Sequence, residues 1–235
     1  SDGVQDCDDD DIDGDGLRNE WDADPYDDTI TRAPTGGLGT DGDLVVSGSM
    51  TLSDWTLLDG GGAIADQTLD VDDGTVFSQE DEILILVQQG SDAGTWQTTF
   101  VTAVVGDSLD IEPPLDVDFL SSSTVLVQRI PHYEDVEVPS GSTLTADDWS
   151  GSGGGVLIFR ASGDVDITGT LTVDNLGYRG GDGVRGNGSN PRQGESVDGL
   201  GSRGVTSAND GGGGAYPRRG DNGDSGGGGA HGAAG

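Results

Sequence analysis

The middle of the chain alternates apolar and polar residues between short turns rich in Gly, Asp and Ser. Segments rich in β-branched residues and bounded by turn-forming residues are typical of β-strands. No window shows the 3.6-residue period of an amphipathic helix. The pattern therefore predicts an all-β protein, with its clearest strands at 82–89, 95–105, 123–130 and 155–162.

One of these segments continues into a hairpin. Residues 96–105 and 108–112 are separated only by Gly106 and Asp107, and a two-residue loop of this kind favours an antiparallel strand pair. Pro113 comes next, and it ends the unit because proline has no amide hydrogen to donate to a neighbouring strand.

A weak internal repeat runs through the chain. It consists of two alternating apolar residues, a glycine turn and a strand rich in Thr and Leu. Repeated short strand–turn units are typical of β-helix rungs or stacked hairpins. The body is therefore expected to be a small β-barrel or sandwich, or to be β-helix-like. The repeats are "DLVVSGSMTL" (43–52), "DVEVPSGSTLTA" (135–146) and "DVDITGTLTV" (164–173).

Composition divides the chain into four predicted regions: an acidic segment at 1–33, an all-β domain at 34–130, β-helix-like strands at 131–176 and a glycine-rich region at 177–235. The last holds 22 of the 44 glycines. It is either a flexible linker or a bundle of extended glycine segments that pack backbone against backbone, as in polyglycine II. We expect the natural chain to continue beyond Gly235.

The net charge narrows the choice of partners. The formal charge is −34, and all ten basic residues are arginine. Such a surface repels nucleic acid and anionic lipid, and no apolar run approaches the length of a membrane span. We therefore expect no nucleic-acid partner and no membrane insertion, but rather calcium, a glycan, a cell-surface protein or another copy of the chain.

Two explanations fit this acidity: calcium binding, and the acidic surfaces of a high-salt proteome. Aspartate outnumbers glutamate by 37 to 7. This bias favours calcium, because calcium loops use Asp at tight spacings.

The segment "DIDGDGLRNEWD" (11–22) matches a calcium-binding loop position by position. A hard cation takes six to eight oxygen ligands, and alternate residues of a tight loop can all point inward. Gly16 stands where such a loop turns sharply. The predicted cofactor is Ca²⁺, with ligands Asp11, Asp13, Asp15, Leu17 (through its carbonyl), Asn19 and Asp22.

Two alternatives remain open within this stretch. An overlapping register places the turn at Gly14 and takes its ligands from Asp9, Asp11, Asp13 and Glu20. A second ion fits Asp22, Asp24 and Asp27.

The run "DIDGDGLRNEWDADPYD" resembles the thrombospondin type 3 repeats of many bacterial surface proteins, over about residues 6–28. The resemblance implies a calcium-stiffened segment without flanking EF-hand helices. Only one repeat is present, so it does not imply a long calcium rod.

The remainder is similar to a glycine-rich module of large secreted bacterial surface and adhesin-like proteins. The similarity rests on "GTDGDLVVSG" (39–48), on residues 127–181 and on "GGGGAHGAAG" (226–235). It implies an extracellular or cell-surface location rather than a reaction.

Candidate catalytic groups are few. Cys7 is the only cysteine, so it cannot form a disulfide within the chain; it is either a free thiol or paired with another molecule. His132 is expected to pack or to support a turn. Arg129 and Arg160 lie on predicted strands, but nothing in the sequence groups them. The four tryptophans are expected to be buried rather than to stack on sugars: Trp21, Trp55, Trp96 and Trp149.

The leading hypothesis is a non-enzymatic structural or adhesive module of an extracellular surface protein, stabilised by calcium. One alternative is a self-assembling subunit of a surface filament or sheath, because unpaired strand edges favour association. A second alternative is a β-helix protein that binds or degrades polysaccharide.

Overall fold

The computed structural model describes residues 37–180 and 194–200, together with Asn19 and Tyr26. Apart from the short 3₁₀ turn η1 (Gly74–Val76), the regular structure in these residues is β-strand, which confirms the predicted all-β class. No helix among them has the length and apolar character needed to cross a membrane.

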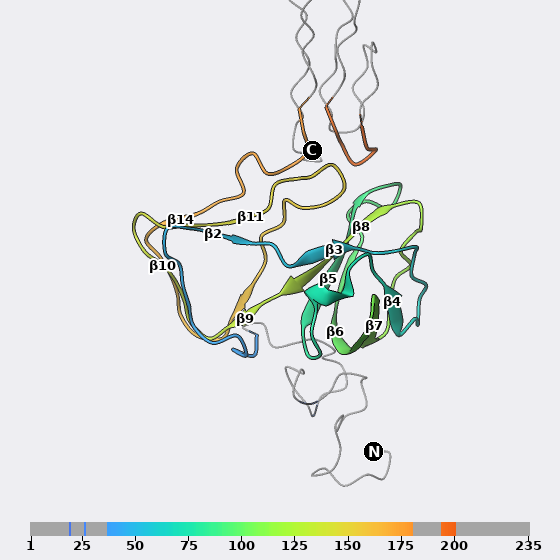
Figure 1. Ribbon diagram of the computed structural model, residues 1–235, viewed down its shortest axis with the longest axis horizontal. Coiled ribbons are helices and arrows are strands. Elements are labelled where there is room, and N and C mark those ends of the chain that lie inside the picture. Colours follow the sequence, from blue (N-terminus) through green and yellow to red (C-terminus); the bar gives the residue numbers. More distant parts are fainter. Residues whose placement is uncertain (1–18, 20–25, 27–36, 181–193, 201–235) are drawn as a thin grey trace, which may run out of the picture.

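Part of the chain forms a stack of three β-helix turns, here called rung 1 (37–52), rung 2 (131–146) and rung 3 (159–173). All strand pairs in the stack are parallel. The rungs lie over one another on the left of Figure 1. Rung 1 contains β1 (Leu44–Val45) and β2 (Ser49–Leu52); rung 2 contains β9 (His132–Tyr133), β10 (Val136–Val138) and β11 (Thr143–Ala146); rung 3 contains β12 (Arg160–Ala161), β13 (Val165–Ile167) and β14 (Thr170–Leu171).

The three sequence repeats are these three rungs, stacked in register. Val136 pairs with Leu44 on one side and with Val165 on the other. One corner later, Thr143 lies between Ser49 and Thr170. Rung 2 is therefore the middle layer, and the repeat predicted from the sequence is confirmed as a β-helix stack.

A second unit is inserted between rung 1 and rung 2. It is a six-stranded antiparallel sheet in the order β3-β8-β5-β6-β7-β4, on the right of Figure 1. A bridge between Leu58 and Val71 joins the two edges, so the sheet curls into a barrel. Its strands are β3 (Trp55–Leu57), β4 (Thr68–Asp70), β5 (Glu82–Gln89), β6 (Trp96–Val105), β7 (Ser108–Glu112) and β8 (Thr124–Ile130).

Most strands expected from alternation are present, and the hairpin of β6 and β7 is confirmed. The strand predicted at 155–162 is wrong except at Arg160–Ala161. Carbonyl groups in and just before this segment accept hydrogen bonds from barrel side chains. Gln88 donates to Gly154 O at 2.7 Å, and Gln128 donates to Val156 O at 3.2 Å. The segment lies between the two units instead of joining a sheet.

Each unit has its own apolar core. The barrel encloses a cluster that includes Ile83, Ile85 and Val127, whereas the rungs enclose a smaller one that includes Val138 and Leu144. The predicted region 34–130 is thus divided, with its first part in rung 1 and the rest in the barrel.

The tryptophans differ in burial. Trp149 is buried and Trp55 is partly buried, but Trp96 is 61% exposed, so the expectation of burial is wrong for Trp96. Trp96 faces outward because its neighbour Gln97 points into the barrel and successive residues of a strand face opposite sides of the sheet. Trp21 lies outside the described residues.

Candidate functional site at the junction of barrel and rungs

A buried ion network joins the barrel to the rungs. Glu82, the first residue of β5, is 2% exposed. Its carboxylate accepts hydrogen bonds from His132 Nε2 at 2.6 Å, and from Arg160 Nε at 2.5 Å and Nη2 at 2.6 Å. Rungs 2 and 3 are therefore both tied to the same barrel side chain.

The hydrogen bonds of His132 define its tautomer. The backbone N–H of Leu38 donates to His132 Nδ1 at 3.0 Å, so Nδ1 is the accepting nitrogen. The proton then lies on Nε2, which donates to Glu82. The ring also packs edge-on against Phe100, with centroids 6.3 Å apart. His132 is buried and held on both sides, in agreement with the expected packing role.

Hydrogen bonding outweighs burial in setting the charge of this network. Burial alone would raise the pKa of Glu82, but hydrogen bonds from Arg160 and His132 hold it below its ordinary value. The same contact with Glu82 raises the pKa of Arg160. The pair is therefore ionised at neutral pH. A buried charge pair of this kind costs much more to break on one side than to replace as a whole.

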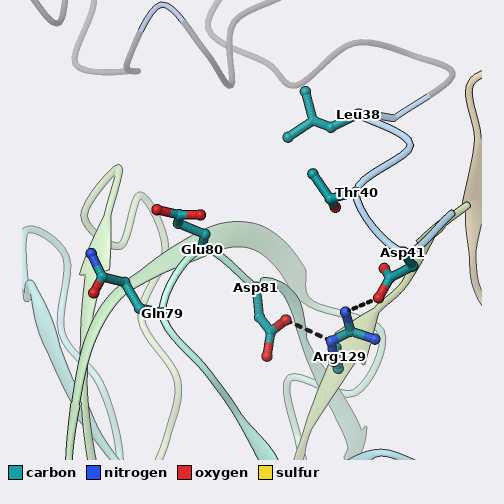
Figure 2. Close-up of a pocket in the computed structure, with 7 residues that line it drawn as sticks. All are labelled: Leu38, Thr40, Asp41, Gln79, Glu80, Asp81 and Arg129. Carbon is teal, nitrogen blue, oxygen red and sulfur yellow. Dashed lines mark hydrogen bonds and ion pairs between the residues drawn. The ribbon is translucent and has the colours of Figure 1, made fainter.

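A pocket of about 410 Å³ opens beside the network (Figure 2). Arg129, near the end of β8, donates from Nη2 to Asp41 Oδ1 and from Nε to Asp81 Oδ1, both at 2.6 Å. Asp41 belongs to rung 1, and its second carboxylate oxygen accepts from His132 N at 2.7 Å. The pocket is lined by Leu38, Thr40, Asp41, Gln79, Glu80, Asp81 and Arg129.

Arg129 keeps its charge at any ordinary pH. Burial would lower its pKa, but the hydrogen bonds to Asp81 and Asp41 raise it above its usual value. One guanidinium thus binds two carboxylates, so the three groups together keep a net negative charge and Arg129 has little capacity left to bind an anion.

Glu80 is the fourth charged side chain that lines the pocket. It is exposed and adopts a φ of +74°, and in Figure 2 its carboxylate points away from Arg129. Its side chain makes no hydrogen bond or ion pair with the part of the chain that the structure describes. Together with Thr40 and Gln79, it could contact a polar ligand.

The described residues that line the pocket do not form an arrangement typical of catalysis. Its carboxylates Asp41 and Asp81 are bound to Arg129, and the nearby His132 already uses both ring nitrogens. Nor does any group of three or more His, Cys, Asp or Glu side chains among residues 37–180 and 194–200 form a metal site.

The predicted calcium segment cannot be compared with this geometry. Asn19 is described, but the other predicted ligands lie outside the described residues: Asp9, Asp11, Asp13, Asp15, Leu17, Glu20, Asp22 and Asp24. The calcium site stays a prediction.

A second ion pair anchors the start of the glycine-rich region. Glu195 accepts hydrogen bonds from Trp149 Nε1 at 2.7 Å and from Arg179 Nε at 2.9 Å. Tyr178 packs edge-on against Trp149, at 4.9 Å between centroids. Next to Glu195, Ser196 O accepts from Gln89 Nε2 at 2.8 Å, so this region is attached to the β5–β6 turn of the barrel.

Sequence reasoning missed both networks, because their members lie far apart in the chain. Glu82 and Arg160 are separated by 78 positions. The one available signal was a charged residue at the edge of an apolar run, as in "EILILV" and "LIFR". That signal marks candidate buried charges but does not say which of them pair.

No protein-family model matches the chain, and no curated protein matches it. Among solved structures, it is similar to the tailspike Gp54 of Acinetobacter baumannii bacteriophage AP22, which was solved in complex with A. baumannii capsular saccharide. The identity is 13% and the TM-score 0.30, over 45% of this chain and 22% of that one.

Two Pseudomonas phage tailspikes are similar at the same level. Gp61 of phage phi297 has 14% identity and a TM-score of 0.29, over 47% of this chain and 19% of its own. Gp49 of phage LKA1 has 12% identity and a TM-score of 0.28, over 45% and 22%. The chain thus spans about a fifth of their lengths. TM-scores below 0.5 do not define a common fold.

Proposed function

We propose that this chain is a calcium-stabilised structural and adhesive module of an extracellular surface protein, without enzymatic activity. Its barrel and rungs act as one rigid joint between the acidic segment and the glycine-rich region. The cell-surface location rests on the resemblance of the acidic segment (about 6–28), and of residues 39–48, 127–181 and 226–235, to bacterial surface proteins.

The ion pairs at the junction of barrel and rungs are the observation that supports a structural role. Arg129 connects Asp81 of the barrel to Asp41 of rung 1, and Glu82 connects the barrel to His132 and Arg160. These are the groups that an active site would need free, and each is already engaged in holding the two units together.

Calcium binding is tested by titration calorimetry and thermal unfolding, in calcium and in chelator. A calcium ion holds its carboxylate ligands together, so we expect binding to be coupled to ordering of the segment. Changing Asp13 and Asp15 to Asn should weaken calcium binding at least tenfold and remove the stabilisation by calcium. The control is Asp72→Asn, an exposed aspartate in the barrel. Unchanged affinity in the double variant would contradict the assigned loop.

The absence of enzymatic activity is tested separately. The wild-type chain is incubated with neutral and acidic polysaccharides, and newly released reducing ends are measured. Release that scales with protein concentration and is lost in a Glu80→Gln variant would overturn the structural proposal. No release is the expected result.

Glycan binding without cleavage is a second candidate function, favoured by the junction pocket. Its volume suits a mono- or disaccharide, and Thr40, Gln79 and Glu80 offer hydrogen-bonding groups to a ligand rich in hydroxyls. Carboxylates outnumber the single arginine, so we expect neutral or amino sugars rather than anionic ones.

A glycan array followed by titration tests this second candidate. Thr40→Val with Gln79→Leu should reduce affinity at least tenfold. The matched control is Thr68→Val with Gln67→Leu, because these residues line a different hollow on β4 and β7. Equal loss in both variants, or no bound glycan at all, would reject the pocket as the site.

A further inference from the structure

In the described part of the chain, four aspartates are followed directly by glycine: Asp41, Asp59, Asp73 and Asp198. This dipeptide can rearrange without an enzyme, because the glycine amide nitrogen can attack the aspartate carboxyl carbon and glycine has no side chain to obstruct the approach. In a folded protein, the attack requires that both the carboxyl group and the amide N–H are free of hydrogen bonds that hold them in place.

The first pair is held on both sides. Asp41 accepts hydrogen bonds on one carboxylate oxygen from Arg129 Nη2 at 2.6 Å and on the other from His132 N at 2.7 Å. The attacking nitrogen, Gly42 N, donates to Gly39 O at 3.1 Å. We therefore expect Asp41 to be protected by the junction that it helps to build.

The pair at Asp73 is held in a similar way. Its Oδ1 accepts hydrogen bonds from Thr75 N at 3.0 Å and from Thr75 Oγ1 at 2.6 Å. Gly74 N donates to Asp107 Oδ1 at 3.0 Å. Neither the carboxyl group nor the nitrogen of this pair is free to move towards the other.

The pair at Asp198 lies in a tight turn. Gly199 N donates to Ser196 O at 2.9 Å, and Asp198 N donates to Ser196 Oγ at 3.1 Å. The attacking nitrogen is thus engaged in the turn, so this pair should also react slowly.

The pair of Asp59 and Gly60 differs from the other three. Both residues are exposed. Neither the Asp59 carboxylate nor the Gly60 N–H makes a hydrogen bond with the part of the chain that the structure describes. A Cβ at Gly60 would meet no atom within 4 Å, so the space around the attacking nitrogen is open.

We propose that Asp59 is a site of spontaneous modification, at which aspartate is converted to isoaspartate. Gly60 N bonds to Asp59 Cγ, and a carboxylate oxygen leaves as water with the proton of the N–H and one proton from solvent. One water then opens the five-membered imide. Cleavage of the bond from Gly60 N to Cγ restores aspartate, whereas cleavage of its bond to the backbone carbonyl carbon gives isoaspartate of unchanged mass.

The position of Asp59 gives the modification a structural effect. Asp59 N donates to Asp70 O at 2.8 Å, and Asp72 N donates to Leu57 O at 2.9 Å. These two hydrogen bonds flank the bridge that closes the sheet into a barrel. Isoaspartate routes the main chain through the former side chain and so adds one carbon atom to it at this point.

The chain after Gly60 has no room for the added atom. A Cβ at Gly61 would lie 2.6 Å from Phe119 O, and one at Gly62 would lie 2.5 Å from Leu115 Cδ1. Gly62 also exchanges two backbone hydrogen bonds with Phe119, at 3.0 and 2.8 Å. We therefore expect the added length to loosen the barrel closure. This proposal is independent of the calcium and glycan proposals.

Ageing of the folded full-length chain tests the modification. The protein is kept for several weeks at 37 °C and mildly acidic pH, and its chymotryptic peptides are separated by chromatography and sequenced by electron-transfer fragmentation. The same incubation in guanidinium chloride is the reference, because unfolding frees all four pairs. We expect similar rates at the four positions in guanidinium chloride, and a rate at Asp59 at least tenfold above the other three in the folded protein. Similar rates in the folded protein, or no isoaspartate at Asp59, would overturn the proposal.

A pair of variants tests the role of the open nitrogen. Gly60→Ala places a methyl group beside the attacking nitrogen and should slow isomerisation of Asp59 at least fivefold. Gly42→Ala is the matched control, because Gly42 also follows an aspartate, has a positive φ and has open space around its Cβ position. It should leave the rate at Asp59 unchanged, and circular dichroism checks that both variants fold. An unchanged rate at Asp59 in Gly60→Ala would contradict attack by this nitrogen.

Hydrogen exchange tests the effect on the barrel. The amide of Asp72 should lose protection in aged wild-type protein, but not in equally aged Asp59→Glu, because glutamate does not form the five-membered imide. No loss in aged wild type, or an equal loss in both proteins, would separate the modification from barrel closure.

Discussion

The barrel and the rung stack are built from the same kind of alternating sequence, but they close their cores differently. Fourteen buried apolar residues form the barrel core, and the sheet curls round it. Six form the rung core, whose rung 3 positions are exposed. Since a stack of repeats gains its stability from contacts between neighbours, a stack of only three rungs should depend on the barrel beside it.

The largest expected effect comes from breaking the junction. Arg160→Leu leaves the Glu82 carboxylate buried with one partner fewer, and removing one member of a buried ion pair costs about 3–5 kcal/mol. We expect a loss of that size in urea unfolding, with the rungs exchanging amide hydrogens before the barrel.

Two controls sharpen this result. Arg179→Leu removes an ion pair of similar geometry away from the junction, and it should leave barrel and rungs unfolding together. The double variant Glu82→Leu/Arg160→Leu should recover part of the loss, since no unpaired charge remains. If Arg160→Leu unfolded in a single transition and lost less than about 1 kcal/mol of unfolding free energy, Arg160 would not hold the two units together.

The next comparison is within the stack. Leu144→Ala opens a cavity in the middle rung and should cost about 3 kcal/mol. Leu171→Ala, at the stacked position of rung 3, should cost about 1 kcal/mol because the side chain is already partly in water. Denaturant unfolding measures both. Equal losses would mean that rung 3 is covered.

Two glycines at the turns between strands of the rungs allow a comparison with a smaller expected effect on stability. At Gly169 a Cβ would lie 2.3 Å from Pro139 O and 2.5 Å from Ser142 O, so Gly169→Ala should cost about 2 kcal/mol through crowding. Gly48 has open space but a φ of +71°, so Gly48→Ala should cost about 1 kcal/mol through backbone strain. Thermal melts rank the two, and the reverse order would show that the corners of rungs 1 and 3 are not packed as described.

The smallest effect is on the pH dependence of stability. Because the pKa of Glu82 is lower in the folded protein than its ordinary value of 4.5, the unfolded chain binds more protons at acid pH. The contribution of Glu82 is complete above about pH 5 and is lost as the pH falls through the folded-state pKa. Glu82→Gln should unfold more easily at pH 7 but lose less stability between pH 5 and pH 3. Parallel pH profiles would contradict this assignment.

The barrel strands were predictable because local alternation defines them. "EILILVQQ" is flanked by turn residues, and it forms β5 with the predicted bounds. The closure of the sheet into a barrel was not predictable, because the bridge between Leu58 and Val71 depends on how far the sheet curls. The rungs were predictable for another reason: a repeat imposes the same register on each layer, even when the layers are far apart in sequence.

The ion network at the junction could not be predicted from alternation or from the repeat. Glu82, His132 and Arg160 come from three different strands, and their meeting depends on how the barrel lies against the stack. The segment at 155–162 shows the same limit. Its apolar residues Leu157 and Phe159 pack on the rung core, a use that alternation alone does not distinguish from a strand.

The barrel is inserted into the β-helix at a place where the chain can accept a different domain. The insert leaves rung 1 after Leu52 and returns at Pro131, and its two ends lie side by side, with Arg129 N donating to Asp54 O at 2.8 Å. The whole barrel is therefore an insertion at a single corner of the β-helix, between rung 1 and rung 2. Corners of this kind are grafting points at which another domain can be exchanged without shifting the register of the stack. A working exchange would have to replace His132 and Arg160 as well, because their partner leaves with the barrel.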